Sequence, residues 1–264
     1  MNAIQEELEL AKGKMLKEMD YCGRKLVCLT RDNVAIVEAM IRNDSAYILS
    51  SDKNAKPVNK NGKQKYGGSS AYWMSLLKKV LLSNESENEY SYEEIIKYAV
   101  ESVDRENSTH LNADGHGRSE ITDRLKKFNR EELIECLKNP DYKEMKLVKE
   151  IAKKTSAEKK PRENISFASK FCHYACFYIF EGTDYQDNYS IYDNILRKAL
   201  PLYLDYYEIR EQYDLKDYGQ YRNAVDAIRK KSGIKTGTEI SRNGFDHLLW
   251  YYHKGRMKFD SNNA

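Results

Sequence analysis

The scarcity of proline constrains the fold of this chain more than any other feature of its sequence. Only four prolines occur in 264 residues, and apolar residues recur at helical spacing between charged ones over long stretches. Because proline interrupts helices and alternating strand patterns are scarce, long helices with short connections are favoured. The sequence therefore predicts an all-α protein.

The apolar/charged periodicity also predicts where the helices lie. A first amphipathic helix is expected over 3–19 and a second over 31–50. Further helices are predicted over 71–83, 91–105, 119–127, 130–138, 143–155, 165–180, 191–208, 218–231 and 238–254. The segment 51–70 is rich in lysine and glycine and is predicted to be a loop or linker.

Composition excludes several classes of protein. The longest apolar stretch, Phe171 to Phe180, is about half of the roughly 20 residues that a membrane-spanning helix needs. The N-terminus lacks the basic start and apolar core of a signal peptide, so a cytoplasmic location and no membrane partner are expected. Five cysteines without a Cys-x-x-Cys pair favour neither a disulfide framework nor a zinc ribbon. The segment 107–118 offers His110, Asp114 and His116 but no fourth ligand, so no metal site is predicted.

Charge is distributed unevenly along the chain although the net charge is only +3. Residues 143–162 carry eight basic against three acidic side chains, 181–220 carry four against nine, and 221–258 carry nine against three. Such blocks are consistent either with a face that binds a phosphate backbone or with ordinary solvated helix faces.

Lys170 and Asp193 are the most informative pair of residues. Lys170 lies within the apolar run Ile165-Ser-Phe-Ala-Ser-Lys170-Phe-Cys-His-Tyr, and Asp193 follows 23 residues later (193 − 170). A buried amine is more often neutral and nucleophilic, although the lysine could equally extend its amine to solvent. Ser190-Ile-Tyr-Asp193 fits a capping box with Ser190 as N-cap, a position that would also let the carboxylate face a developing cation.

The two segments around this pair carry a family resemblance. Ile165-Ser-Phe-Ala-Ser-Lys170-Phe-Cys-His-Tyr and Tyr189-Ser-Ile-Tyr-Asp193-Asn-Ile-Leu-Arg resemble the core of helix-hairpin-helix DNA glycosylases, in particular the 8-oxoguanine DNA glycosylase-like branch. In that superfamily a lysine begins the helix after the hairpin, and an aspartate follows some twenty residues on. The ending Asp246-His-Leu-Leu-Trp250-Tyr-Tyr is also similar. The resemblance covers about 145–255.

Two departures from the family pattern affect what can be expected. The hairpin Lys160-Pro161-Arg162-Glu163-Asn164 lacks the glycines that let backbone amides approach a phosphate, so Arg162 and nearby lysines would have to act by charge. The four-cysteine motif of the endonuclease III branch is absent, so no iron–sulfur cluster and no other cofactor are expected.

The resemblance implies a two-lobed helical fold within one compact unit, 1–264. One lobe would be 30–180, ending in the hairpin and the Lys170 helix; the other would be 1–29 plus 181–264, carrying Asp193. The implied function is a monomeric DNA glycosylase that extrudes a base, with possible strand nicking by β-elimination. Lys170 would attack C1′ and Asp193 would stabilise the developing positive charge. The base excised would be an oxidised guanine or a modified phage base.

The resemblance and the charge pattern also assign supporting residues. The base pocket would be built from or supported by Phe171, His173, Tyr174, Tyr178, His247 and Trp250. Backbone phosphates would be bound by Lys159, Lys160, Arg162, Arg229, Lys230 and Lys231, with the Lys53–Lys65 loop as a further candidate.

Two alternatives remain open at this point. Arg242-Asn-Gly-Phe-Asp-His247 resembles the Arg-x(4–6)-His motif of metal-independent HEPN ribonucleases, in which such a pair could stabilise and protonate a leaving group. The chain could instead be a non-enzymatic DNA-binding or partner-binding helical protein, in which Lys170 and Asp193 form a structural ion pair or never meet.

Overall fold

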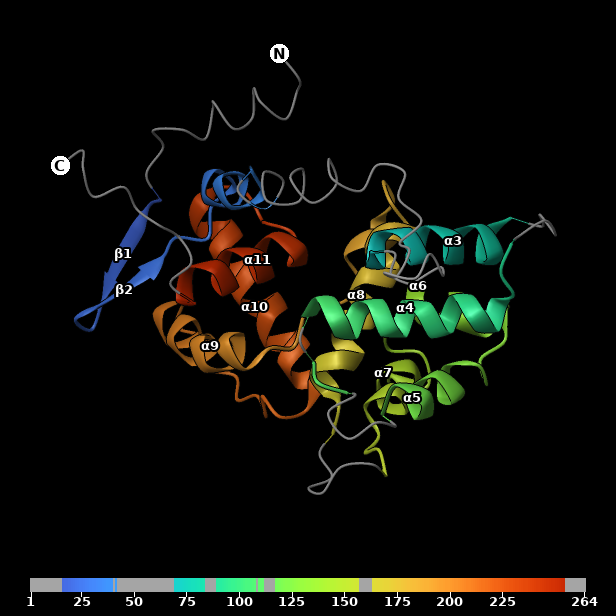
Figure 1. The fold of residues 1–264 in the computed structure, drawn as a ribbon. Coiled ribbons are helices and arrows are strands. Elements are labelled where there is room, and N and C mark those ends of the chain that lie inside the picture. The colour runs from blue at the N-terminus through green and yellow to red at the C-terminus, as the bar shows by residue number, and fades with distance from the viewer. Residues whose placement is uncertain are drawn as a thin grey trace, which may run out of the picture. The chain divides into compact units, whose positions relative to one another are not determined.

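The computed structural model describes residues 16–39, 41, 69–83, 89–107, 109–111, 117–156 and 163–254. Over these ranges the chain is mostly helical with one pair of short strands, which confirms the predicted fold class (Figure 1). Residue contacts divide the chain into two compact units. We call Ala55–Tyr192 the central unit and Met1–Asn54 with Asp193–Ala264 the terminal unit. The boundaries near 55 and 193 differ from the 30 and 181 expected from the sequence.

The described helices of the central unit pack around one apolar helix. They are α3 (Ser70–Leu82), α4 (Tyr92–Asn107), α5 (Gly117–Leu125), α6 (Arg130–Lys138), α7 (Lys146–Ala152), α8 (Ile165–Ile179) and the 3-10 turn η1 (Asp184–Asp187). Helix α8 contacts α3, α4, α6, α7 and η1. Phe167, Phe171 and Cys172 of α8 are therefore completely buried. Burial from several directions explains why this helix is apolar almost throughout instead of along one stripe.

The terminal unit combines a β-hairpin with helices from the end of the chain. Strands β1 (Glu18–Tyr21) and β2 (Arg24–Val27) pair antiparallel, residues 31–39 are helical, and α9 (Asn194–Tyr206), α10 (Tyr218–Thr236) and α11 (Arg242–His253) follow. Helix α9 contacts α10 and α11, and α11 also contacts β2.

The β-hairpin corrects the prediction of a helix over 3–19. Residues 18–21 form a strand because the two-residue turn Cys22-Gly23 adopts positive φ at both positions, 48° and 72°. A two-residue turn with this backbone matches the twist of paired strands. The part of the expected helix before residue 16, the later half of the helix expected over 31–50, and the Lys53–Lys65 loop lie outside the described residues.

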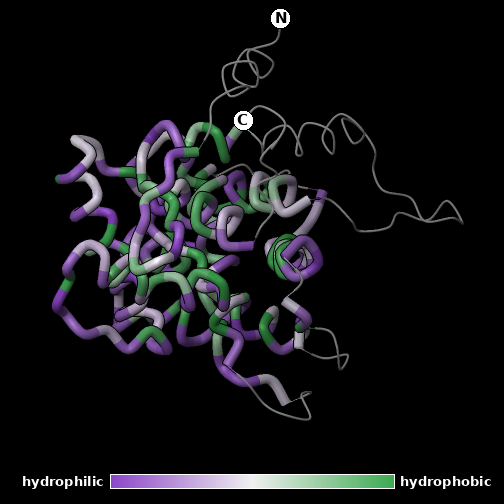
Figure 2. The backbone as a smooth tube through the Cα atoms, turned by 90° about the vertical axis from the view of Figure 1, so that its left-hand side faces the viewer, coloured by the Kyte–Doolittle hydropathy of each residue, from purple (hydrophilic) through white to green (hydrophobic). Residues whose placement is uncertain are grey.

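Helix starts follow from capping residues that the sequence supplies. Ser69 accepts a hydrogen bond from the Tyr72 amide at the start of α3, and Asn129, Asp217 and Ser241 do the same for α6, α10 and α11. Each cap satisfies an amide that has no partner within its helix. In Figure 2, hydrophilic and hydrophobic residues alternate along the backbone of the helices. No helix in the described ranges is long and apolar enough to span a bilayer.

Candidate active site

Lys170 is a buried residue of α8 and not a surface lysine. It is the sixth residue of the helix and is 9% exposed. Its neighbours Ser169 and Phe171 are completely buried. The lysine therefore sits in the second turn of α8, a position that agrees with the helix predicted over 165–180. Extension of its amine to bulk solvent is disfavoured by this burial.

The connection between α7 and α8 is closed at its base. The Asn164 amide donates to the Ala152 carbonyl over 2.8 Å, and the Asn164 side chain donates to the Lys153 carbonyl over 3.3 Å. The guanidinium of Arg124 donates to the carbonyls of Lys153 and Lys154 over 2.6 and 2.8 Å. The two contacting helices α7 and α8 are thus joined by a connection whose ends are held by hydrogen bonds. The hairpin residues predicted to bind phosphate, Lys159, Lys160 and Arg162, lie outside the described residues.

Asp193 begins the terminal unit as the N-cap of α9. Its carboxylate accepts a hydrogen bond from the Ile195 amide over 2.7 Å. This corrects the expected capping box, because α9 begins at Asn194 and Asp193, not Ser190, is the cap. Residues 188–193 form no regular secondary structure. The carboxylate of Asp193 is therefore oriented by a backbone amide at the positive end of the helix dipole.

One hydrogen bond joins the chain neighbours of the two candidate residues. The Tyr192 amide donates to Oγ of Ser169 over 2.9 Å, within the central unit. Ser169 precedes Lys170 and Tyr192 precedes Asp193. The backbone that leads into Asp193 consequently lies against the turn of α8 that carries Lys170.

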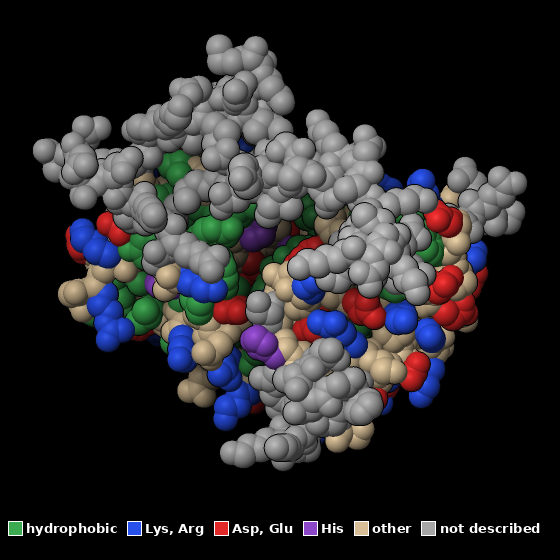
Figure 3. Space-filling view, viewed as in Figure 1, with side chains coloured by type: hydrophobic (Ala, Val, Ile, Leu, Met, Phe, Trp, Pro, Cys, Tyr) green, Lys and Arg blue, Asp and Glu red, His purple; other side chains and the backbone are tan. Residues whose placement is uncertain are grey.

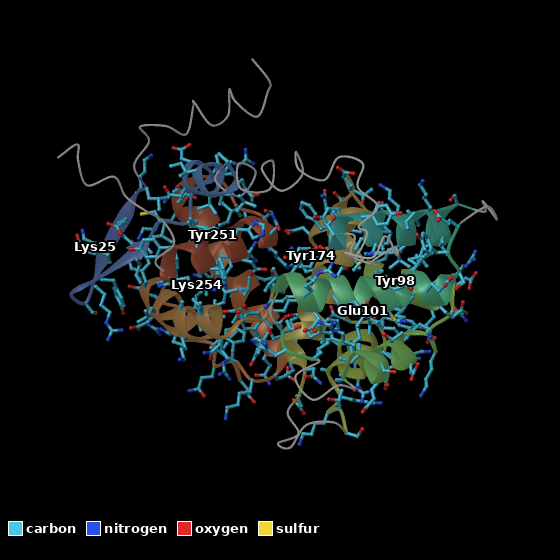
Figure 4. All side chains as sticks on the ribbon, in the orientation of Figure 1. Lys25, Tyr98, Glu101, Tyr174, Tyr251 and Lys254 are labelled. Atoms are coloured by element: carbon cyan, nitrogen blue, oxygen red, sulfur yellow. The ribbon has the colours of Figure 1, made fainter. Side chains whose placement is uncertain are left out.

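The aromatic candidates of α8 divide into a buried and a half-buried group. Phe171 and His173 are buried, so they can support a pocket wall only from behind. Tyr174 and Tyr178 are half-buried, and their rings stack with centroids 6.4 Å apart and planes 17° apart. The Tyr174 hydroxyl donates to Asn107 at the end of α4 over 3.1 Å. Tyr174 is labelled in Figure 4. Burial raises the pKa of Tyr178, with the nearby Glu106 adding to the effect.

The remaining pocket candidates lie on α11 in the terminal unit. Nδ1 of His247 is 2.7 Å from a carboxylate oxygen of Glu38, which also accepts a hydrogen bond from Asn243 over 3.1 Å. Trp250 is half-buried, and the amine of Lys254 lies 4.0 Å from its ring centroid. These side chains therefore brace α11 against the segment 31–39 and against its own last turn.

The basic residues predicted to bind phosphate differ in their exposure. Arg229 is buried and donates to the Ile240 carbonyl over 2.8 Å and to Asp226 over 2.9 Å. It holds α10 to the start of α11, so its assignment as a phosphate ligand is not supported. Lys230 and Lys231 are exposed on α10, where they remain accessible to an anionic partner.

Much of the basic block 143–162 is balanced by acidic neighbours. Lys143 and Lys146 pair with Glu132 across to α6, Lys149 with Glu144, and Lys153 with Glu150. On the face seen in Figure 3, basic and acidic side chains alternate over the helices of the central unit. Of these acidic partners only Glu132 lies outside the block, so the count along the sequence overstates the net positive charge of the block by this one carboxylate.

The two residues of the ribonuclease alternative point to different partners. Arg242, the first residue of α11, donates to Asp226 of α10 over 2.7 Å, whereas His247 bonds to Glu38. Five positions on a helix separate side chains by roughly 140° because each residue turns about 100°. A shared site for Arg242 and His247 is therefore disfavoured.

No group of three His, Cys, Asp or Glu side chains in the described ranges is arranged to hold a metal ion. Asp114 and His116 of the segment 107–118 lie outside those ranges. The Asp104 carboxylate holds both ends of that loop, because it accepts hydrogen bonds from the Leu111 amide and from the Arg118 side chain. Comparisons with protein-family models, with curated proteins and with solved structures each returned no significant match.

The residues that hold the segment before Asp193 were not among those predicted from the sequence. Besides Ser169, the side chains of Asn188 and Tyr189 bond to the last carbonyls of α6. One signal was present in the sequence. Pro140 lacks an amide hydrogen and follows Cys136 by four residues, so the Cys136 carbonyl needs a donor from elsewhere.

Proposed function

We propose that the protein is a DNA glycosylase that excises a damaged or modified base, with Lys170 as nucleophile and Asp193 as its electrostatic partner. The observation that carries this proposal is the hydrogen bond between Ser169 and the Tyr192 amide. It ties the backbone before Asp193 to the turn of α8 that holds a 9% exposed lysine. A buried amine and an oriented carboxylate so connected are the groups that the reaction needs.

The chemistry follows from these two groups. The neutral amine of Lys170 forms a bond to C1′ of the deoxyribose while the glycosidic C1′–N bond breaks, and the electron pair and a proton go to the departing base. The carboxylate of Asp193 stabilises the positive charge that develops on the sugar. Opening of the sugar ring then gives an imine between Lys170 and C1′, from which β-elimination can nick the strand.

The stacked rings of Tyr174 and Tyr178 support a role in holding an extruded base. They follow Lys170 by four and eight residues and so extend from the same side of α8. A flipped base is held by stacking on aromatic side chains, which offsets about a few kcal/mol of unstacking. Phe171 and His173 would support this wall from the core.

The α7–α8 pair is proposed as the helix-hairpin-helix element. Its support is the closed base of the connection, in which Asn164 bonds to Ala152 and Arg124 bonds to the carbonyls of Lys153 and Lys154. Phosphate contacts are assigned to the hairpin residues Lys159, Lys160 and Arg162. The exposed Lys230 and Lys231 would add contacts that carry no sequence information.

Borohydride trapping tests the proposal directly. The protein is mixed with a duplex that contains an abasic site and with one that contains 8-oxoguanine, the imine is reduced, and covalent adducts are counted on a denaturing gel. We expect an adduct that Lys170→Gln abolishes and that Lys149→Gln, at an exposed and ion-paired lysine, leaves intact. Unfolding curves of both variants establish that the fold survives.

The other results of these assays distinguish the glycosylase from the alternative functions. No adduct with the wild type overturns the proposal, and DNA binding without an adduct favours the non-enzymatic alternative. An adduct that persists in Lys170→Gln assigns the chemistry to another amine. RNA cleavage that is lost in His247→Ala favours the ribonuclease alternative. A chromatographic screen of bases released from defined oligonucleotides and from modified phage genomes would then identify the substrate base.

A further inference from the structure

We propose that Ser169 and His173 are positioning residues that fix the backbone leading into Asp193 against α8. This inference rests on the glycosylase function proposed above. Ser169 stands immediately before Lys170 and His173 one turn after Ser169, so the two residues bracket the proposed nucleophile. They act on the reaction through Asp193 and touch neither the base nor the sugar.

The hydroxyl group of Ser169 both donates and accepts a hydrogen bond. The side chain is completely buried, its Oγ donates to the Ser166 carbonyl over 3.1 Å, and it accepts from the Tyr192 amide over 2.9 Å. A hydroxyl has one hydrogen, and here that hydrogen is directed to its own helix. A lone pair is thereby left facing the Tyr192 amide. Consecutive Cα atoms lie about 3.8 Å apart, so fixing Tyr192 restricts where Asp193 can begin α9.

His173 holds the same segment three residues earlier. Its Nδ1 lies 2.9 Å from the Tyr189 carbonyl, and the side chain is 1% exposed. A carbonyl can only accept a hydrogen bond, so Nδ1 carries the proton. The imidazole also stacks on Phe177, with centroids 6.2 Å apart and planes 19° apart. The ring is therefore a fixed donor to the segment.

The far end of the segment is held by α6. The side-chain amide of Asn188 donates to the Leu137 and Lys138 carbonyls over 2.9 and 2.8 Å, and the Tyr189 hydroxyl donates to the Cys136 carbonyl over 2.6 Å. Irregular backbone is thus anchored at both ends by side chains. Such support matters for a carboxylate whose effect on a transition state depends on displacements of about 1 Å.

The composition of α8 supports this assignment. Alanine at position 169 would be a better helix former, and an apolar side chain at 173 would bury no polar group. A buried polar side chain costs stability unless it is bonded. In α8, Ser169 accepts a hydrogen bond from the segment that ends at Asp193 and His173 donates one to it.

Ser169→Ala tests the proposal against a matched control, Ser102→Ala. Ser102 is also completely buried in a helix of the central unit and donates to the carbonyl three residues before it. Its hydroxyl differs in having no role at the segment before Asp193. Base release is measured on the 8-oxoguanine duplex, or on the phage DNA from which the wild type releases a base. Imine trapping on the abasic duplex is measured in parallel.

We expect Ser169→Ala to slow base release at least tenfold while trapping of the abasic duplex changes by less than twofold. Trapping needs the Lys170 amine but no departing base, so it separates the two steps. In an Asp193→Asn background, Ser169→Ala should slow base release little further. A residue that acts only through Asp193 has no additional effect once the Asp193 carboxylate is removed. Amide exchange should quicken in 188–194 for Ser169→Ala and not for Ser102→Ala.

His173 is tested by rescue with a conservative variant. His173→Asn retains a donor near the position of Nδ1 and should restore most of the base release lost in His173→Ala. Additive effects of Ser169→Ala and Asp193→Asn, or equal losses in base release and trapping, overturn the positioning role. A wild type that forms no adduct and releases no base overturns the proposed function, and this inference with it.

Discussion

The bond between Tyr189 and the end of α6 gives a stability prediction that does not depend on function. Tyr189→Phe removes only the hydroxyl that donates to the Cys136 carbonyl over 2.6 Å. Both residues are buried, with exposures of 1% and 2%. In a continuing α-helix the Cys136 carbonyl would accept from the amide of the residue four positions later. That residue is Pro140, which has no amide hydrogen.

The expected magnitude follows from what the substitution leaves behind. Water cannot replace the hydroxyl readily at a site with this burial, so the Cys136 carbonyl loses its donor. Leaving a buried carbonyl without a partner costs about 1–3 kcal/mol. The ring of Tyr189 stays in place, so no cavity larger than one oxygen atom forms. We therefore expect Tyr189→Phe to lower the free energy of unfolding of the central unit by that amount.

Tryptophan fluorescence can report on the central unit alone. The chain has two tryptophans, Trp73 in α3 and Trp250 in α11, so Trp250→Phe leaves one reporter in the central unit. Urea unfolding in this background gives the difference in free energy of unfolding between the protein with Tyr189 and the Tyr189→Phe variant. Tyr185→Phe is the control, because that ring is 42% exposed on η1. If Tyr189→Phe lowers the free energy of unfolding no more than Tyr185→Phe does, the Cys136 carbonyl does not depend on the Tyr189 hydroxyl, and the prediction is refuted.

Three further predictions concern other parts of the chain. In Gly244→Ala the new Cβ would lie 2.7 Å from Cγ1 of Val34, so we expect a loss of about 1–3 kcal/mol in urea unfolding, relieved by Val34→Ala. Burial lowers the pKa of His253. The unfolded chain therefore takes up the proton first below about pH 6.5, and melting temperatures should fall from pH 7 to 5, less steeply in His253→Phe. If the protein binds DNA as proposed, the double substitution Lys230→Ala and Lys231→Ala should reduce the slope of log K against log salt concentration by roughly two. Alanine at the ion-paired Lys149 and Lys153 should change that slope less.

Helix positions were largely predictable because they depend on local signals. Apolar periodicity and capping residues such as Ser69 and Asn129 specify where α3 and α6 lie without reference to the rest of the chain. The start of α9 was misplaced because Ser190 and Asp193 are both good N-caps. Packing of the segment 188–192 against α8 decides between them, and that packing is a tertiary effect.

Whether a charged residue is exposed or ion-paired was less predictable than the helix on which it lies. Arg229, Lys230 and Lys231 are consecutive in sequence, yet helical geometry turns Arg229 inward to Asp226 while the lysines face outward. The sequence also could not indicate that Lys143 and Lys146 face Glu132 of α6, because that contact joins two different helical segments. Charge counts treat such residues as equivalent, although burial and ion pairing determine whether they are available to an anionic partner.

The buried polar residues of α8 argue that this helix does more than fill the core of the central unit. Ser169, Lys170 and His173 are each at most 9% exposed in a helix that is otherwise apolar or aromatic along its buried positions. Apolar residues at all three positions would avoid the cost of desolvating polar groups. Two of the three bond to the segment that ends at Asp193, and the third is the lysine between them. Holding the segment 188–192 against α8 accounts for Ser169 and His173, and a role for Lys170 as nucleophile, as proposed above, would account for the buried amine between them.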